Sequence, residues 1–430
     1  MYECPLFRAI VVMRYFFHVA AACALIAGSL SASQAAQPLS LTEAVSIAVR
    51  KQDPTVTAPR ERAAALSEKA VADSQLPDPA LNVGLLNLPV DTFDFTQEPV
   101  TQAKVGLQQQ FPPGRTRSVT RHRRLAEAGV EEAAALLQET RIKRETRINW
   151  LELYYWLGAR QKVEESQRAV RELVSVAKSI FATGRQNSQD VLRAELELSL
   201  LDDRLIDVRR RVELARADLA RYIGPGAASR PLAAALPNLT APPAQARLRQ
   251  ILVRHPSVVV EDTRIEVREH DIELAREQYK PRFSVGLEYA ARGGRDMRGE
   301  RPDFLSGKVS MSLPFFTGNR QDRNLSAAHR RHSSAMLSRS ARLLELDKAL
   351  ARTYADWLRL GERIKLYGQV VIQRAADTTK ASLTAYQSGV ADFAELIRSR
   401  LALLDNELML LRLRANRAQA HAKLLFLAGK

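Results

Sequence analysis

The stretch that decides the fold runs from Arg115 to Phe181 and reads RTRSVTRHRRLAEAGVEEAAALLQETRIKRETRINWLELYYWLGARQKVEESQRAVRELVSVAKSIF. It contains no proline, and only Gly129 and Gly158 interrupt its helix-forming residues. At 1.5 Å per residue, a single helix over this stretch would be roughly 100 Å long. Such a helix cannot bury one face inside a compact globule, so the stretch predicts a coiled-coil or tube-like assembly.

A second proline-free stretch of similar length, Arg320 to Tyr386, follows roughly 200 residues later, a spacing that indicates an internal repeat. Four landmarks recur in the same order at this offset. They are Val49–Pro54 and Val253–Pro256, Gln75–Leu81 and Gln278–Phe283, Phe111–Arg115 and Leu313–Arg320, and Phe181–Gly184 and Tyr386–Gly389. We therefore predict a first repeat over residues 37–223, a Pro/Gly/Ala-rich connector over 224–243 and a second repeat over 244–430.

Each repeat is predicted to run helix, strand, strand, very long helix, turn and long helix, with the first helix over residues 41–74. The returning helices carry apolar residues at alternating spacings of three and four, which is typical of a coiled-coil seam. These residues are Val191, Ala194, Leu198, Leu201, Leu205, Val208, Val212, Ala215, Leu219 and Tyr222, and then Ile397, Leu401, Leu404, Leu408, Leu411, Ala415, Ala418, Ala422 and Leu425.

The four predicted strands alternate apolar and polar residues with period two. The apolar positions are Leu81, Val83 and Leu85; Ala103, Val105, Leu107 and Phe111; Phe283, Val285, Leu287 and Tyr289; and Leu305, Val309, Met311 and Leu313. This alternation suits a sheet with lipid on one side and water on the other, although a half-buried soluble hairpin shares it. Four strands leave open edges, which lipid does not tolerate, so we expect several copies of the chain to pool their strands.

The first 36 residues resemble a secretory signal peptide, with Arg8 and Arg14 followed by an apolar run and small residues. Both cysteines, Cys4 and Cys23, lie in this segment, so the mature chain is expected to form no disulfide. The sequence leaves open whether Cys23 is an acylated N-terminus. The net charge of +16 is spread along helices among glutamates, which disfavours nucleic acid as a partner. No catalytic constellation or cofactor motif appears, so we expect neither an enzyme nor a cofactor.

Over nearly the whole mature chain these features resemble the TolC family of outer-membrane efflux proteins. The resemblance rests on the opening Leu39–Val45 followed by Asp53-Pro54, on the two-fold repeat and on the paired aromatic-x-x-Gly turns. It implies a mainly α fold with a small β part. In that fold long helices form an α-barrel, and four strands per copy enter a 12-stranded transmembrane β-barrel of a homotrimer. The implied location is the outer membrane and its lipid, with a large periplasmic part and a periplasmic adaptor protein as partner.

Within that family, the segments Leu76–Pro79, Asn87–Phe95 and Gln97–Pro99 resemble the branch that serves heavy-metal cation pumps of the RND type in the inner membrane. The predicted function is therefore an exit duct for heavy-metal cations. Two alternatives remain open. One is a duct for type I protein secretion or drug efflux, and the other is a periplasmic coiled-coil scaffold without a pore.

The resemblance places the two turns at Gly184 and Gly389 at the periplasmic tip, where the adaptor docks and the tunnel narrows. It also places Asp190 and Glu395 at acidic pore positions and gives Tyr386 a helix-to-helix contact with an aspartate. The residues allow simpler roles: helix capping for Asp190, pairing with Arg398 for Glu395, and tip packing for Tyr386. Arg398 and Ala391 depart from the family pattern, which makes a strongly acidic pore ring doubtful.

Overall fold

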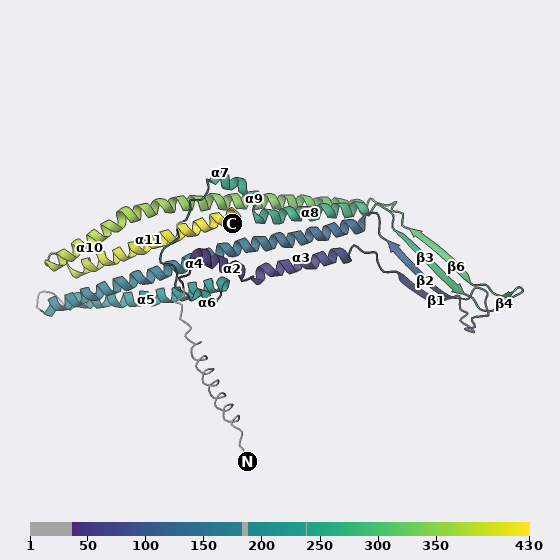
Figure 1. The fold of residues 1–430 in the computed structure, drawn as a ribbon, viewed down its shortest axis with the longest axis horizontal. Coiled ribbons are helices and arrows are strands. Elements are labelled where there is room, and N and C mark those ends of the chain that lie inside the picture. Colours follow the sequence, from purple (N-terminus) through teal and green to yellow (C-terminus); the bar gives the residue numbers. More distant parts are fainter. Residues whose placement is uncertain (1–36, 183–187, 238) are drawn as a thin grey trace, which may run out of the picture.

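The computed structural model describes residues 37–182, 188–237 and 239–430. The predicted signal peptide, including Cys4 and Cys23, and Gly184 lie outside the described residues. Figure 1 shows an elongated molecule in which the helices run side by side and the strands extend from one end. The chain is mainly helical with a small β part, which confirms the predicted fold class.

The first half contains two short helices, a pair of strands and a long helical hairpin. Its elements are α2 (Leu41–Arg50), α3 (Pro54–Ala72), β1 (Ala80–Leu86), β2 (Gln102–Phe111), α4 (Thr116–Ala182), α5 (Ser188–Ile223) and the short α6 (Pro225–Ala228). Helix α4 has 67 residues and agrees closely with the helix that the proline-free stretch predicts.

The second half has the same order. Its elements are α7 (Gln245–Leu252), α8 (Pro256–Glu277), β3 (Phe283–Ala291), β6 (Phe304–Met311), α9 (Gln321–Leu366), a π-helical segment (Tyr367–Val371), α10 (Ile372–Gln387) and α11 (Phe393–Leu427). Two very short strands, β4 (Arg295–Asp296) and β5 (Gly299–Glu300), lie between β3 and β6. The division into repeats at residues 224–243 stays a prediction.

The single helix predicted over residues 41–74 is wrong, because the chain breaks between α2 and α3. Gln52 adopts a positive φ of 51°, and Asp53 begins a new helix whose first residue is Pro54. A proline disfavours helical backbone at the residue before it and suits the first position of a helix. The same break separates α7 from α8, where His255 precedes Pro256.

The long helices pack in the order α5, α4, α11, α10, with α9 continuing the line of α10 (Figure 1). Near the end that lies away from the sheet, one apolar core joins the two helical hairpins. Its buried members include Val163, Val170, Val174, Leu201, Tyr386, Phe393, Leu396 and Leu404. In the described residues no helix has an apolar stretch long enough to cross a membrane.

A buried carboxylate holds the junction between the helices and the sheet. Glu277, at the end of α8, accepts hydrogen bonds from the backbone N–H of Arg115 (2.6 Å) and from Nζ of Lys280 (2.7 Å). Burial alone would raise the pKa of Glu277, but these contacts outweigh it and the pKa lies below its ordinary value. Gly114 passes directly beside this carboxylate with a φ of 52°. The α8–β3 and β2–α4 connections are therefore locked together.

We expect Gly114→Ala to destabilise this junction by about 1–3 kcal/mol, because the substitution meets both a strained backbone and a clash. A Cβ there would overlap the Glu277 carboxylate and the Lys280 side chain. Gly318 occupies the matching landmark of the second half, and a Cβ there meets no atom within 4 Å. Gly318→Ala is therefore the control. Thermal unfolding in detergent measures the stability of both variants. An equal loss of stability in the two would contradict the role of Glu277.

Candidate functional site

The four main strands form one antiparallel sheet in the order β1, β2, β3, β6, and their register gathers the apolar residues on one face. Leu107 pairs with Leu81 in β1 and with Leu287 in β3. Successive side chains point to opposite faces, so the whole apolar set shares a side. Its exposed members are Leu81, Val83, Leu85, Val105, Leu107, Phe111, Phe283, Val285, Leu287, Tyr289, Leu305, Val309 and Met311.

The opposite face of the sheet is polar. Lys104 in β2 forms an ion pair with Glu288 in β3, with Nζ and Oε1 2.8 Å apart. Gln108 donates from Nε2 to Oγ of Ser284 at 3.2 Å. A continuous exposed apolar face is rare on a protein that meets only water, and it marks an interaction surface. The sheet is therefore built to stand between an apolar medium and an aqueous one.

The sheet has two open edges. In the described chain β1 pairs only with β2, and β6 pairs only with β3. Each edge strand presents backbone N–H and C=O groups that a neighbouring strand can pair. An apolar medium requires such groups to be paired, because no water is present to replace the missing hydrogen bonds.

The second candidate region is the end of the helices that lies away from the sheet (Figure 1). Here α10 turns into α11 through Gly389, whose φ of 75° is the left-handed conformation that glycine adopts most readily. Asp190 lies in the first turn of α5, and Glu395 in the first turn of α11. The two carboxylates thus belong to different helical hairpins. Gly184, the first of the two predicted turn glycines, lies outside the described residues.

Tyr386 and Glu395 have clear local contacts at this tip. The buried Tyr386 ring packs edge-on against Phe393, with ring centroids 5.4 Å apart. Glu395 forms an ion pair with Arg398 at 2.8 Å, as the i,i+3 spacing suggests. Both side chains are more than half exposed, so this pair adds little stability. It does reduce the negative charge that Glu395 offers to its surroundings.

Two residues that hold the tip, Asp392 and Phe393, are not among the predicted site residues. The Asp392 side chain caps α11 by accepting the backbone N–H of Glu395 at 2.8 Å. Phe393 is fully buried and closes the apolar core of the tip. The spacing Asp392-x-x-Glu395 is a helix-start signal that could have found the cap. The burial of Phe393 depends on α10 folding back beside it, which no local pattern reveals.

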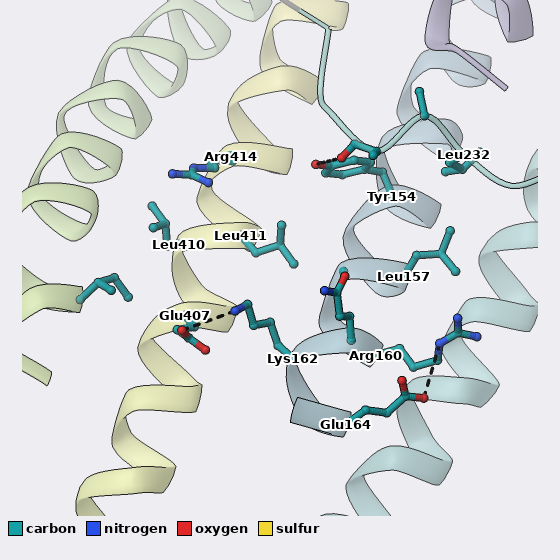
Figure 2. Close-up of a pocket in the computed structure, with 15 residues that line it drawn as sticks. Tyr154, Leu157, Arg160, Lys162, Glu164, Leu232, Glu407, Leu410, Leu411 and Arg414 are labelled. Carbon is teal, nitrogen blue, oxygen red and sulfur yellow. Dashed lines mark hydrogen bonds and ion pairs between the residues drawn. The ribbon is translucent and has the colours of Figure 1, made fainter. Parts of the chain in front are cut away.

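A groove of about 650 Å³ lies midway along the helices, where residues 232–234 of the predicted connector cross α4 and α11. Figure 2 shows two pairs of its charged side chains directed at each other. Lys162 reaches Glu407 at 3.5 Å, and Arg160 reaches Glu164 at 3.8 Å. Among the described residues no group of three or more His, Cys, Asp or Glu side chains could hold a metal ion. The residues that line the groove come from both halves of the chain and from the predicted connector.

The comparisons with known proteins agree with this geometry. Residues 248–430 match the outer membrane efflux protein family. The predicted resemblance to outer-membrane efflux proteins is thereby confirmed, as is the prediction that the chain is not an enzyme. No curated protein matches the sequence.

Solved structures show that the similarity in fold extends beyond residues 248–430. A membrane protein from Pseudomonas aeruginosa is similar with a TM-score of 0.77 and 18% identity over 90% of each chain. The outer membrane protein VceC from Vibrio cholerae has a TM-score of 0.74 and 18% identity over 90% of this chain and 96% of its own. CusC, described as forming a transmembrane channel, has a TM-score of 0.72 and 15% identity over 90% and 91%. Both halves therefore adopt the fold of these solved structures.

At this end of the helices, Asp392 should matter more to local stability than Glu395. We expect Asp392→Ala to cost about 1 kcal/mol, because α11 loses its N-cap. Glu395→Ala, the matched control, removes only an exposed ion pair and should cost less than about 1 kcal/mol. Amide hydrogen exchange over residues 393–399 measures both. Equal protection in the two variants would show that Asp392 does not hold the start of α11.

Proposed function

We propose that the protein is a passive outer-membrane channel and the exit duct of a tripartite efflux system. The observation that carries this proposal is the sheet, with its apolar residues on one face and its ion pair and glutamines on the other. In an outer membrane the apolar face would meet lipid and the polar face would line water. The family match of residues 248–430 supports the same assignment.

The channel requires more than one copy of the chain. One copy supplies four strands with two open edges, which cannot close a barrel. The resemblance to the efflux family supports a homotrimer, in which three copies make a 12-stranded transmembrane β-barrel. The long helices would then form an α-barrel in the periplasm. The helix–sheet junction would join this α-barrel to the β-barrel in the outer membrane. The signal peptide proposed over residues 1–36 would direct export.

The free ends of the helical hairpins would face a periplasmic adaptor and, through it, an inner-membrane RND-type pump. We assign the periplasmic tip to Gly184, Asp190, Tyr386, Gly389, Glu395 and Arg398. Since Glu395 pairs with Arg398, its contribution to an acidic constriction would be reduced. Asp190 is half-buried in the first turn of α5 and would be the stronger source of negative charge. Energy for transport would come from the pump alone.

The sheet provides the sharpest test of the membrane assignment. Leu107 and Gln108 are neighbours in β2 and lie on opposite faces, the first 58% exposed on the apolar side. Leu107→Lys should cost about 2–4 kcal/mol in the membrane and prevent insertion, because the ammonium would lie in lipid. Gln108→Lys, facing water, should insert normally. Outer-membrane fractionation and conductance in planar bilayers measure both, and a soluble wild-type monomer without conductance would contradict the channel.

The finer proposal concerns the cargo, which we assign to heavy-metal cations on the resemblance of segments 76–79, 87–95 and 97–99. The described residues hold no cluster that could retain such a cation, so it would pass through in water. Deleting the gene should increase sensitivity to copper, silver, zinc, cobalt or cadmium, and the wild-type gene should restore growth. Sensitivity to dyes and detergents alone would assign the duct to drug export. Loss of a secreted protein alone would assign it to type I secretion.

A further inference from the structure

The charged side chains of the four main strands all lie on the polar face of the sheet. These strands contain three charged residues, Lys104, Glu288 and Lys308. Lys308 pairs across the strands with Gly286, which pairs in turn with Gln108, so Lys308 shares the face of the glutamines. Any charge that these strands present therefore acts on the polar side of the sheet.

Arg282 adds a further positive charge to this face, at the end of the sheet that joins the helices. The backbone N–H of Ser312 donates to the carbonyl of Arg282 at 2.9 Å, which extends the pairing of β3 and β6 by one residue. Phe283 belongs to the apolar face, so the side chain of the residue before it points to the polar one. A pocket of about 260 Å³ agrees with this placement, because Arg282 lines it together with Gln110 and Ser284 of the polar face.

Two of these positive charges have no counter-charge. Lys104 holds the carboxylate of Glu288 at 2.8 Å, so those two charges cancel. In the described part of the chain, the side chains of Lys308 and Arg282 form neither an ion pair nor a hydrogen bond. Both are exposed, and Gly286 beside Lys308 has no side chain that could cover it. The polar face thus presents an excess of two positive charges.

We propose that Lys308 and Arg282 set the charge preference of the duct and shift it toward anions. In an aqueous pore, rings of Lys or Arg side chains favour anions over cations. Each copy of the chain adds the same two charges at the same two depths, so a closed barrel carries them as two positive rings. Ser312, the partner of Arg282, lies four residues beyond Lys308 in the chain, which places the two rings about 13 Å apart along the strands.

This inference deepens the proposed channel and rests on it for the closure of the sheet into a pore. It concerns the passive flow of small ions, and a metal-cation cargo would pass the two rings against their charge, driven by the pump. A fixed charge about 10 Å from an ion in water changes the local concentration of that ion roughly twofold. Salt screens the effect beyond about 30 Å at 0.01 M but beyond only about 3 Å at 1 M. The preference is therefore modest and disappears in concentrated salt.

Reversal potentials of the full chain in planar bilayers test the proposal. In a gradient of dilute KCl, near 0.01 M, we expect Lys308→Gln and Arg282→Gln each to lower the permeability ratio of chloride to potassium by roughly twofold. The double variant should lower it further. The matched control is Lys104→Gln combined with Glu288→Gln, which removes one charge of each sign from the same face and should keep the wild-type ratio. All variants share the loops at the far end of the strands, with their carboxylates Asp91 and Asp94, so the differences report the sheet alone.

The outcomes separate this inference from the channel itself. A double variant that conducts with the wild-type ratio in dilute KCl would overturn the role of Lys308 and Arg282 and leave the channel standing. A shift that persists in 1 M KCl, or that the charge-neutral control reproduces, would report a change in the shape of the wall and would also overturn it. A wild-type protein that forms no conducting pore would overturn the proposed channel, and this inference with it.

Discussion

A helix of 67 residues needs a partner along its whole length, and the rest of the structure depends on that constraint. Helix α4 meets it with several neighbours in turn: α8 and α3 near the sheet, α2 and α11 midway, and α5 toward the tip. Trp150, near the middle of α4, is fully buried, and its Nε1–H donates to the backbone carbonyl of Leu39 at 3.2 Å. This bond ties the start of the described chain to the longest helix.

The two halves cap the helix that follows the break, α3 or α8, with different side chains. Asp53 caps α3 and pairs with Arg221, and hydrogen bonds from Arg221 and Thr55 hold the pKa of that carboxyl well below its ordinary value. His255 caps α8 by accepting the N–H of Ser257, while its Nε2 donates to the carbonyl of Phe426 at 3.1 Å. Burial lowers the pKa of His255, so the neutral ring that can accept a hydrogen bond is favoured. Both halves therefore have a helix break before a proline, although the residue that caps the next helix is an aspartate in one half and a histidine in the other.

The open edges of the sheet place a demand on the assembly. The sheet needs neighbours because its edge strands, β1 and β6, have unpaired backbone groups. These two strands form the opposite edges of the sheet (Figure 1). The junction at Glu277 and Gly114 connects the sheet to the long helices, so it fixes how the sheet edges are placed relative to those helices.

The sequence by itself determined the long helices, the strand pairs and the ion pair between Glu395 and Arg398. Absent prolines, period-two alternation and an i,i+3 spacing are local signals, and each acts within a few residues. Only the tertiary structure decided which strands lie side by side and that Phe393 closes the tip core around Tyr386. These features join residues far apart in the chain, and their energies depend on burial and shape that no local pattern specifies.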